Sequence, residues 1–569
     1  MLARFDDFLT GRSLRLTDPV RELVATRLDE VVPALTEAAA IAEAGAWVAA
    51  VVAYEAAPAF DSALRTRDPD PGLPLAWFGV FGGARPADPP DPAEPPPTTW
   101  ESDTAEAGHA RAVDEVRRLI ARGVTYQVNL THRLTAMVDD PARLYAAMVH
   151  AQRPAFGALL DVGGHTIVSA SPELFFSLEG SRIATRPMKG TIGRGRWAAE
   201  DERRRALLAA SAKDRAENLM IVDLLRNDVG RVAAFGTVAV DDLFAIERYE
   251  TVWQMTSTIT AERRPDAGLA DVFGALFPCG SVTGAPKSST MAAIAELESS
   301  PRGVYCGAIG LLRPGGRATF SVPIRTVTVD PHGLATFGTG GGITWDSEPA
   351  GEWAEASVKA RVLTARRPSF DLLETLRLEP DGFPLLDRHL ARLAASAAYF
   401  GREVDLDAIR DVLERVPGPD RPVAVRLTVA SNGEAAVVVR EIPDTDRPVR
   451  LAIDPRPIDR SDVFRFHKTT VRGMYDDAAA RFPDADDVVS VNDRGEAVET
   501  TIGNLLVRLD GRWLTPSLDA GCLPGVGRAV LLDEGAIQEA AISVDRLLQA
   551  EAIEVVNAVR GRRAAIVEP

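Results

Sequence analysis

Residues 186–191 of the 569-residue chain read RPMKGT and place Lys189 between a proline-fixed turn and a glycine. An apolar run, LFF at 174–176, precedes this stretch, and a charged segment begins near Arg194. Proline fixes its own φ and glycine tolerates turn conformations, so we expect Lys189 at the start of a loop and not on a solvated helix face. Such a lysine is by itself more often a surface charge than a nucleophile, and the motifs around it must decide.

On both sides of this stretch, the spacing of apolar residues predicts a mixture of helices and strands. Apolar spacing predicts helices at 20–44, 105–122, 214–228, 286–299 and 349–364, and buried strands at 47–54 and 126–130. The proline-rich segment 85–97 predicts a long exposed loop. No strict βαβ rhythm runs through these elements, which favours an α+β fold class.

A breaker-rich joint, ARRPS at 365–369, interrupts the chain before the pattern restarts. A strand at 370–378, a turn at Asp381-Gly382 and a helix at 387–400 are predicted after it. A chain of this length exceeds one ordinary core, so we expect two domains, 1–365 and 366–569.

Composition limits the possible partners. A formal net charge of −17 would repel the phosphates of a nucleic acid. No apolar run approaches the ~20 residues that span a bilayer, and no secretory signal is visible, so no membrane partner is expected. Three cysteines without metal-site spacing suit a reducing cytoplasm. An anionic substrate would need a local concentration of arginine, lysine, backbone amides or a metal ion.

Several motifs in the first part of the chain occur together. They are SPELF at 171–175, PMKGT at 187–191, DRAEN at 214–218, DLLRND at 223–228, FPCGSVTGAPK at 277–287 and GTGGGI at 338–343, followed by a helix with Glu352, Glu355 and Lys359. In this order and spacing they resemble the chorismate-utilising enzymes across residues 45–362. The resemblance implies an N-terminal chorismate-binding fold of β-sheets with flanking helices.

Glu352, Glu355 and Lys359 share one helix face at i, i+3 and i+7, which alone would favour a solvated face with an ion pair. The resemblance implies instead that Glu217 and Glu355 bind Mg²⁺, with Glu352 nearby or acting through water. Carboxylate oxygens suit this hard cation, which would hold the ring carboxylate of chorismate.

The resemblance also implies a set of substrate-binding residues. These are Gln127, Thr283, Tyr305, Arg325, Gly340, Gly341, Gly342 and Lys359. The glycines let the backbone approach an anion closely, and an arginine can clamp a carboxylate in a bidentate way. A buried structural arginine remains the alternative for Arg325. The glycine run is not read as a dinucleotide site, because no strand–loop–helix unit with a downstream acid surrounds it.

Two positions indicate which chorismate chemistry to expect. Members that add water resemble one another in carrying a lysine base where this chain has Gln127, which cannot accept a proton from water. Anthranilate synthases usually have alanine at the position of Lys189, whereas the PxKGT form resembles aminodeoxychorismate synthase component I. The resemblance implies that a neutral Lys189 attacks ring C2 while the 4-hydroxyl leaves and ammonia enters at C4. Glu173 would be the general acid, with a pKa raised by an apolar pocket.

One position departs from this family. Gln254 stands in VWQMTS at 252–257, where family members usually carry a histidine. An amide can hydrogen-bond but cannot titrate, so any acid–base role of that histidine must be absent or moved.

A second set of motifs lies in the C-terminal part. It consists of FDLLETLR at 370–377, HLARL at 389–393, HKTTVR at 467–472, ETTIGNL at 499–505, WLTP at 513–516, LPGVGR at 523–528 and NAVRG at 557–561. In order and spacing these resemble the fold-type IV pyridoxal-phosphate enzymes over about 370–565, and the 4-amino-4-deoxychorismate lyases in particular. A two-subdomain α/β fold is implied, together with a possible homodimer formed through this domain.

The same resemblance implies roles for six residues. Lys468 would bind pyridoxal 5′-phosphate (PLP) as a Schiff base and then remove the C4 proton. Glu499 would bond the pyridine nitrogen. Arg392 and the amides near Val526 and Gly527 would bind the phosphate, and Asn557 would add a further contact. Solvated positions for Lys468 and Arg392 are the structural alternative.

Together the two resemblances imply a bifunctional enzyme of folate synthesis. The first half would aminate chorismate to 4-amino-4-deoxychorismate, and the second would expel pyruvate to leave 4-aminobenzoate. No glutamine amidotransferase motif surrounds any cysteine, so ammonia would come from a separate glutaminase subunit. Three alternatives stay open: an anthranilate-forming enzyme, a synthase fused to a branched-chain or D-amino-acid-type aminotransferase, and a scaffold whose sites have decayed.

Overall fold

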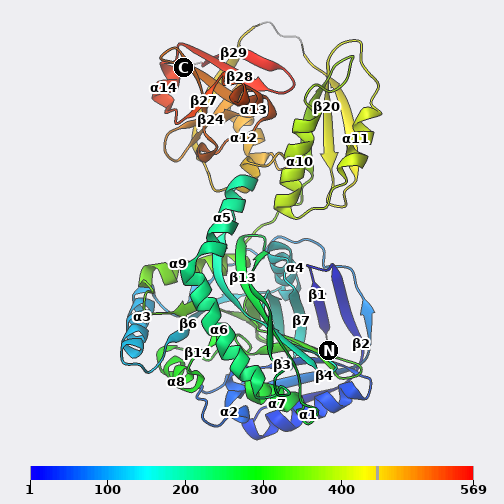
Figure 1. Ribbon diagram of the computed structural model, residues 1–569, viewed down its shortest axis with the longest axis vertical. Coiled ribbons are helices and arrows are strands. Elements are labelled where there is room, and N and C mark those ends of the chain that lie inside the picture. The colour runs from blue at the N-terminus through cyan, green and yellow to red at the C-terminus, as the bar shows by residue number, and fades with distance from the viewer. Residues whose placement is uncertain (1, 444–446, 568–569) are drawn as a thin grey trace. The chain divides into compact units, whose positions relative to one another are not determined.

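The computed structural model describes residues 2–443 and 447–567 (Figure 1). The chain forms two compact units. Unit 1 comprises Met1–Gly193 and Arg205–Arg367, and unit 2 comprises Arg194–Arg204 and Pro368–Pro569. The excursion at 194–204 was not expected from the sequence, although the break after Arg367 lies inside the predicted joint.

Unit 1 is built on one large system of antiparallel strands. These are β1 (Ala3–Asp7), β2 (Arg12–Ala25), β3 (Trp47–Val52), β4 (Ala76–Pro86), β5 (Glu101–Ser102), β6 (Gln127–Met137), β7 (Phe156–Val162), β8 (His165–Ser171), β9 (Leu174–Glu179), β10 (Arg182–Arg186), β11 (Met188–Gly193), β12 (Ala239–Arg248), β13 (Val252–Glu262), β14 (Gly284–Ala285), β15 (Ala308–Arg313), β16 (Arg317–Ser321), β17 (Thr326–Val329) and β18 (Leu334–Ile343).

Helices accompany these strands in unit 1. They are α1 (Leu28–Glu43), α2 (Ala57–Phe60), α3 (Glu106–Ala121), α4 (Pro141–Gln152), α6 (Ala212–Gly230), α7 (Leu269–Leu276), α8 (Lys287–Leu297) and α9 (Pro349–Ala360), while α5 (Ala198–Ala210) begins in unit 2 and ends in unit 1. The predicted helices at 105–122, 214–228 and 286–299 are confirmed by α3, α6 and α8.

Buried strand residues form the core of unit 1. Five of the six residues of β3 are buried, and β3 pairs with β4 on one side and β15 on the other. Such a continuous apolar run is typical of a strand covered on both faces. Helices α1 and α7 pack on this region through Val31, Leu35 and Phe273, which belong to one buried cluster.

Two local predictions in unit 1 are wrong. Residues 20–25 belong to β2, which pairs with β4, and the helix begins only at Leu28. Lys189 lies within β11 and not at the start of a loop. Gly190 has φ +97°, and the β11–β13 register shifts between Met188 and Thr191. The glycine is therefore absorbed as an irregularity inside a paired strand, because long-range pairing overrides the local turn preference.

Unit 2 has two parts. The first is the three-stranded sheet β19 (Leu372–Leu378), β20 (Val423–Val429) and β21 (Ala435–Glu441) with helices α10 (Leu386–Phe400) and α11 (Leu406–Glu414). The second is an eight-stranded sheet with both parallel and antiparallel pairs, in the order β24-β23-β22-β29-β28-β25-β26-β27. The helix predicted at 387–400 is confirmed by α10.

The elements of the second part follow one another closely in sequence. They are β22 (Val449–Ile458), α12 (Gly473–Arg481), β23 (Asp487–Asn492), β24 (Ala497–Thr500), β25 (Asn504–Leu509), β26 (Arg512–Pro516), α13 (Val526–Asp533), β27 (Gln538–Ala540), α14 (Val544–Leu548), β28 (Ala552–Asn557) and β29 (Gly561–Val567). Helices and strands in both units confirm the α+β class. Across the described residues, no helix combines the length and apolarity needed to cross a membrane.

Candidate functional sites

Lys189 lies in a small polar group in unit 1. Its Nζ is 3.4 Å from Glu217 Oε2 on α6, and its backbone carbonyl accepts a 3.1 Å hydrogen bond from Asn218. A Cβ at Gly342 would lie 2.8 Å from Lys189 Nζ and 2.6 Å from Gln127 Nε2. A side chain at this point of β18 would displace both groups, so the lysine and the glutamine converge over bare backbone.

Gln127 contributes an unused acceptor to this group. The side chain is buried, and its Oε1 has no hydrogen-bond partner among the described residues. A buried amide oxygen without a protein partner is costly, so Gln127 Oε1 next to Lys189 is available to accept from a bound water or a ligand group.

Gln254 holds the backbone that follows Lys189. Its Nε2 donates to the carbonyl of Gly190 at 2.8 Å, and its Oε1 accepts from Thr191 Oγ at 2.8 Å. The side chain is buried and both ends are bonded. The glutamine therefore serves as a neutral clamp on the Lys189 strand, a role that needs no titratable group.

We predict that Gln254→Ala lowers the rate of a reaction that uses Lys189 by about tenfold to 100-fold, since misplacing a reacting group by about an ångström is costly. Gln254→Asn, which is shorter, should be nearly as slow. The measurement is the initial rate at saturating substrate, with Lys213→Ala on the exposed start of α6 as a control. A rate within twofold of wild type would contradict the clamp role.

Glu173 lies between β8 and β9 and is buried, with Oε1 accepting from Ser281 Oγ at 2.7 Å. Burial raises its pKa to about 7, although the hydrogen bond from Ser281 and the charge of Lys189 act in the opposite direction. A carboxyl group in this range can be protonated near neutral pH, as a general acid requires.

Two of the predicted metal ligands converge over Gly341. A Cβ there would lie 3.2 Å from Glu352 Oε2 and 3.6 Å from Glu355 Oε1. Lys359 Nζ pairs with Glu355 at 2.7 Å and donates to the carbonyl of Gly340 at 2.8 Å. Burial and the neighbouring Glu355 raise the pKa of Glu352. Burial opposes ionisation of Glu355, but Lys359 outweighs it and leaves that pKa lowered.

The full set of three carboxylates is not gathered. Glu217 is engaged with Lys189, and no three His, Cys, Asp or Glu side chains within 2–443 and 447–567 stand close enough together to hold a metal ion. The structure thus brings together two of the three predicted oxygen donors. Mg²⁺ keeps several waters in protein sites, so two carboxylates and a substrate oxygen remain a chemically suitable donor set.

Three predicted substrate-binding residues have protein partners. Thr283 is buried and donates to the carbonyl of Cys279, and Tyr305 is buried with its ring against Gly338. Arg325 donates to Gln152, and burial lowers its pKa. These contacts fit the structural alternative as well, so their substrate roles stay predictions.

The sequence reasoning did not select Asn218 and Ser281 as site residues. Both stand in the quoted motifs, DRAEN and FPCGSVTGAPK, which was the available signal. Their partners, Lys189 and Glu173, are 29 and 108 positions away, so only the fold could reveal the pairing.

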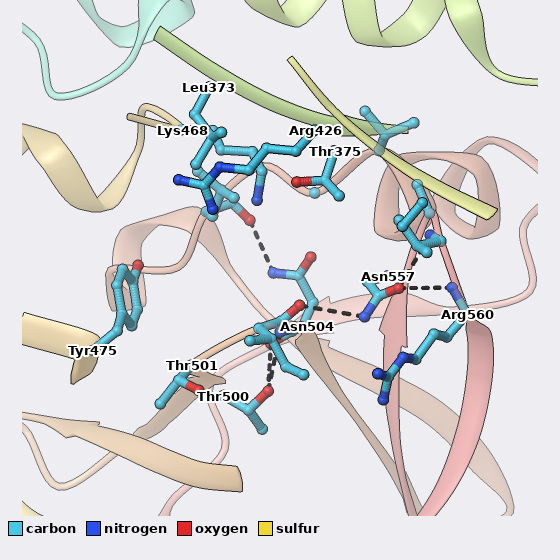
Figure 2. A pocket seen from close by; sticks show the side chains of 18 of the residues that line it. Leu373, Thr375, Arg426, Lys468, Tyr475, Thr500, Thr501, Asn504, Asn557 and Arg560 are labelled. Atoms are coloured by element: carbon cyan, nitrogen blue, oxygen red, sulfur yellow. Dashed lines mark hydrogen bonds between the residues drawn. The ribbon is translucent and has the colours of Figure 1, made fainter. Parts of the chain in front are cut away.

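Unit 2 contains a cavity of about 410 Å³ with Lys468 in its wall (Figure 2). Burial and the nearby Arg392 lower the pKa of Lys468 to about 8. This volume lies in the range of cofactor and ligand pockets. A lysine that loses its proton easily in such a pocket is suited to covalent and base chemistry.

Arg392 on α10 is held in place at the cavity. It forms a bidentate pair with Glu374 at 2.8 and 2.6 Å and donates to the carbonyl of Pro524 at 3.2 Å. His389 also contacts Glu374 at 2.7 Å, and its buried Nε2 has no partner among the described residues. Burial opposes ionisation of Glu374, yet Arg392 and His389 lower its pKa to about 2.

Glu499 at the end of β24 is buried and accepts three hydrogen bonds. They come from Tyr475 Oη at 2.8 Å, the Leu523 amide at 2.9 Å and Arg465 at 3.4 Å. Burial raises its pKa, and Arg465 partly offsets the effect. The geometry fixes the carboxylate within the cavity wall.

The start of α13 offers amides to an anion. Gly525 is its N-cap, so Val526 and Gly527 begin the helix and no side chain caps their N–H groups. A Cβ at Gly525 would lie 1.9 Å from Asn504 Oδ1, so this approach requires glycine. Asn557 accepts from the amides of Val559 and Arg560 and thereby shapes the turn after β28 at the cavity edge (Figure 2).

Arginines that the sequence reasoning did not select also line the cavity. They are Arg426, Arg440, Arg472 and Arg560. Burial, then Arg440 and Arg472, lower the pKa of Arg426, as expected for like charges gathered together. Arg426 stands on β20 and Arg440 on β21, two paired strands, so the fold brings both arginines to one cavity. The cavity is therefore suited to an anion with more than one carboxylate or phosphate group.

The three cysteines are free and buried. Burial raises the pKa of the thiols to about 12 for Cys279 and Cys522 and about 11 for Cys306. A nucleophilic cysteine needs a lowered pKa, so none of them is suited to attack glutamine.

Comparison with known proteins finds two families in consecutive parts of the chain. Residues 84–365 match the family model of chorismate binding enzymes, and residues 371–565 match that of class IV aminotransferases. An aminodeoxychorismate synthase of Streptomyces griseus is 40% identical over 332 residues, covering 58% of this chain and 43% of that protein. An anthranilate synthase component 1 of Haloarcula marismortui is 39% identical over 268 residues, covering 47% and 53%.

Among solved structures, anthranilate synthase component I of Streptococcus pneumoniae gives a TM-score of 0.55 at 23% identity, covering 64% of this chain and 92% of that one. This likeness shows the fold. The chain spans about half the length of the curated relatives it matches. Amination at either ring position is represented among these relatives, so their names do not decide between the two products.

Proposed function

Because the chain belongs to the chorismate binding enzymes over residues 84–365 and to the class IV aminotransferases over 371–565, we propose that it makes 4-aminobenzoate from chorismate in two consecutive steps. The first step aminates chorismate at C4, and the second removes pyruvate. The observation that carries the proposal is the presence in one chain of Lys189 beside Gln127 and of Lys468 in a cofactor-sized cavity. We assign the first step to residues 1–365 and the second step to residues 366–569.

In the first step Lys189 is the nucleophile that distinguishes 4-amination from anthranilate formation. The amine attacks C2, the C4–O bond breaks, and Glu173 gives its proton to the departing hydroxyl so that water leaves. Ammonia then adds at C4 and releases the lysine. Attack requires a neutral amine that is free to reach the ring, so the 3.4 Å ion pair between Lys189 and Glu217 must open first.

The remaining residues bind the substrate. Gln127 offers its free acceptor, and the Gly340–Gly342 backbone admits the ring closely. Thr283, Tyr305, Arg325 and Lys359 complete the proposed substrate site.

Mg²⁺ fits the donor chemistry of Glu352 and Glu355, with Glu217 as the third proposed ligand. When bound, the ion supplies positive charge that holds the ring carboxylate. The protein would contribute the carboxylates and keep Lys359 beside them to limit their combined negative charge.

Removing Mg²⁺ should separate the two steps. We expect EDTA to stop chorismate consumption and added Mg²⁺ to restore it, while pyruvate release from supplied aminodeoxychorismate continues. Glu355→Gln should raise the half-saturating Mg²⁺ concentration by about tenfold or more. Glu348→Gln, on an exposed residue just before α9, is the matched control. An unchanged Mg²⁺ requirement in Glu355→Gln would contradict the assignment.

The pH profile should report Glu173. A general acid works only when protonated, and its pKa of about 7 means that the active fraction falls as pH rises through 7. The descending limb of the amination rate should therefore centre near 7. Ser281→Ala removes a hydrogen bond that favours the carboxylate, so the limb should move to higher pH. A limb that stays in place in Ser281→Ala would rule out Glu173 as its source.

Residues around the unit 2 cavity fit PLP. Lys468 is suited to bind its aldehyde, Arg392 and the amides of Val526 and Gly527 to hold its phosphate, and Glu499 to face its pyridine nitrogen, with Asn557 at the edge. When bound, PLP supplies an electron sink. Lys468 would take the C4 proton and return it to the departing enolpyruvate as the C3–O bond breaks, so that pyruvate leaves and the ring becomes aromatic.

The arginines in the cavity favour a lyase substrate over a branched-chain amino acid. Aminodeoxychorismate carries two carboxylates, which Arg426, Arg440, Arg472 and Arg560 can neutralise. An apolar side chain would leave several of these charges without a counter-ion, which is costly in a partly buried site.

Partners follow from the chemistry. The substrate is chorismate, and the buried, high-pKa thiols support an external source of ammonia, which we propose to be a separate glutamine amidotransferase subunit. A homodimer through the PLP-binding unit and a cytoplasmic location in folate synthesis complete the proposal.

The deciding experiment is to incubate the protein with chorismate, Mg²⁺ and an ammonium salt, with and without PLP, and to identify the products. 4-Aminobenzoate plus pyruvate, dependent on PLP, is the expected result. Anthranilate as the aromatic product would overturn the role of Lys189. Transfer of the amino group to a keto acid would indicate a fused aminotransferase, and absence of turnover a scaffold.

A further inference from the structure

The excursion at 194–204 belongs to unit 2, although its sequence lies only five residues after Lys189. We propose that residues 194–204 are a positioning element of the PLP site, acting on Lys468 through Phe466 and His467. This inference rests on the proposed binding of PLP to Lys468 and extends it to residues outside the class IV aminotransferase match.

The excursion begins with a turn that is closed by hydrogen bonds among its own residues. Arg194 binds Asp201 through two hydrogen bonds of 2.7 and 2.6 Å, and the Gly195 amide donates to the same carboxylate at 2.9 Å. A Cβ at Gly195 would lie 2.1 Å from the Asp201 nitrogen, so this tight turn excludes every other residue. The turn at the start of the segment is therefore closed by its own hydrogen bonds, and Arg194 also donates to the carbonyl of Tyr399 at 3.0 Å.

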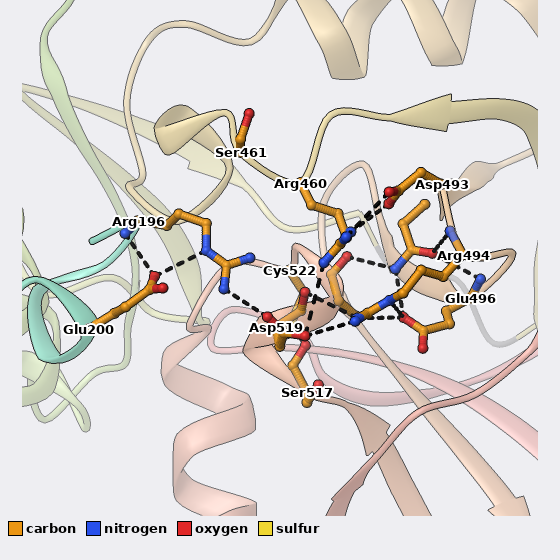
Figure 3. A network of polar contacts seen from close by, with 12 residues as sticks. Arg196, Glu200, Arg460, Ser461, Asp493, Arg494, Glu496, Ser517, Asp519 and Cys522 are labelled. Atoms are coloured by element: carbon orange, nitrogen blue, oxygen red, sulfur yellow. Dashed lines mark hydrogen bonds and ion pairs between the residues drawn. The ribbon is translucent and has the colours of Figure 1, made fainter. Parts of the chain in front are cut away.

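The excursion contacts the rest of unit 2 through an aromatic pair and an ion pair. Trp197 packs against Phe466 with centroids 5.2 Å apart, and the Arg196 guanidinium lies 5.3 Å from the same ring. Arg196 also bonds Asp519 at 2.8 Å (Figure 3). Arg494 reaches the other Asp519 oxygen at 2.9 Å, so Arg196 joins an established polar network of unit 2.

The contact closest to Lys468 is made by His467. Its Nε2 lies 3.2 Å from the carbonyl of Arg196, and its Nδ1 lies 3.0 Å from Ser396 Oγ. Burial lowers the pKa of His467 to about 4, so the ring is neutral. A carbonyl can only accept, so Nε2 carries the proton and Nδ1 accepts from Ser396. The excursion thereby fixes both the tautomer and the orientation of the ring.

The backbone at Lys468 is thus held by β19 and, through the preceding residue, by the excursion. Its carbonyl accepts from the Leu373 amide on β19 at 2.9 Å, while the preceding residue is tied to the excursion. The His467 ring is also packed against Tyr399 at 4.2 Å, and Tyr399 Oη donates to the carbonyl of Gly195 at 2.7 Å. Loosening the excursion should therefore let Lys468 move and admit water to its pocket.

The test is PLP binding by the 569-residue chain, measured by absorbance and fluorescence titration. Trp197→Ala should raise the PLP dissociation constant by about three- to tenfold, the effect of losing one aromatic contact. The pH midpoint of the bound-PLP absorbance should rise, because admitted water favours the protonated, charged form of the Lys468 nitrogen that is bonded to PLP. Trp197→Phe keeps a ring on Phe466 and should restore both values.

Two further variants secure the result. Asp519→Asn weakens the docking without touching the rings and should shift both quantities in the same direction, by less. Arg410→Ala removes an equally short but exposed pair, with Asp387 on α10, and should change neither. Circular dichroism confirms that each variant is folded.

The proposal is overturned if Trp197→Ala and Asp519→Asn match Arg410→Ala in PLP affinity and pH midpoint, or if the wild-type chain binds no PLP. Its failure is distinguishable from failure of the proposed function, because PLP binding is read without turnover. If the chain binds PLP through this element yet makes no 4-aminobenzoate, the proposed function is contradicted and the positioning role of residues 194–204 is not.

Discussion

Lys468→Ala is expected to stop the reaction after its first step. Aminodeoxychorismate should accumulate from chorismate and ammonia, and 4-aminobenzoate formation should fall by at least about 10³-fold, the order that a positioned acid–base group contributes. The physical reason is that Lys468 is the buried amine of the cavity, with its pKa lowered to about 8. Products are separated by chromatography, and pyruvate is measured with a coupled assay.

Lys468→Arg is the matched control, since it keeps the positive charge but cannot form a covalent bond with an aldehyde. It should be as inactive in pyruvate release as Lys468→Ala, while both variants consume chorismate at the wild-type rate. Full pyruvate release by either variant would show that the second step does not use this lysine.

Lys189→Ala should lose the first step and retain the second. Formation of aminodeoxychorismate is expected to fall by about 10³-fold, because the covalent route through C2 is lost. Pyruvate release from supplied aminodeoxychorismate should be unchanged. The residue touches Glu217 and faces Gln127 across Gly342, so its removal leaves the strand pairing of β11 intact.

Lys213→Ala controls for general loss of positive charge near Glu217, since its Nζ is 4.0 Å from that carboxylate but 67% of its side chain is exposed. It should retain the wild-type rate. If Lys189→Ala instead made anthranilate at an appreciable rate, the lysine would direct the ring position attacked and would not be needed for amination as such. Unchanged 4-amination would remove Lys189 from the mechanism.

The sequence by itself determined much of the helical content of the chain, whereas the extent of its two units also depends on the excursion at 194–204. Helices α3, α6, α8 and α10 follow from apolar spacing and end signals that lie within a few turns of each other. The resemblance of the motifs to two families likewise named Lys189 and Lys468 as candidate nucleophiles, whereas the residue types alone left surface charges as the alternative.

Only the tertiary structure decided how those residues are held. The pairing of β11 with β13 moved Lys189 from an expected loop into a strand and brought Gln254 onto Gly190, 64 positions away. The excursion at 194–204 joins unit 2 through contacts such as Arg196 with Asp519, 323 positions apart. Contacts between residues so far apart in the sequence depend on strand register and on packing within each unit. A local pattern of polar and apolar residues does not predict either.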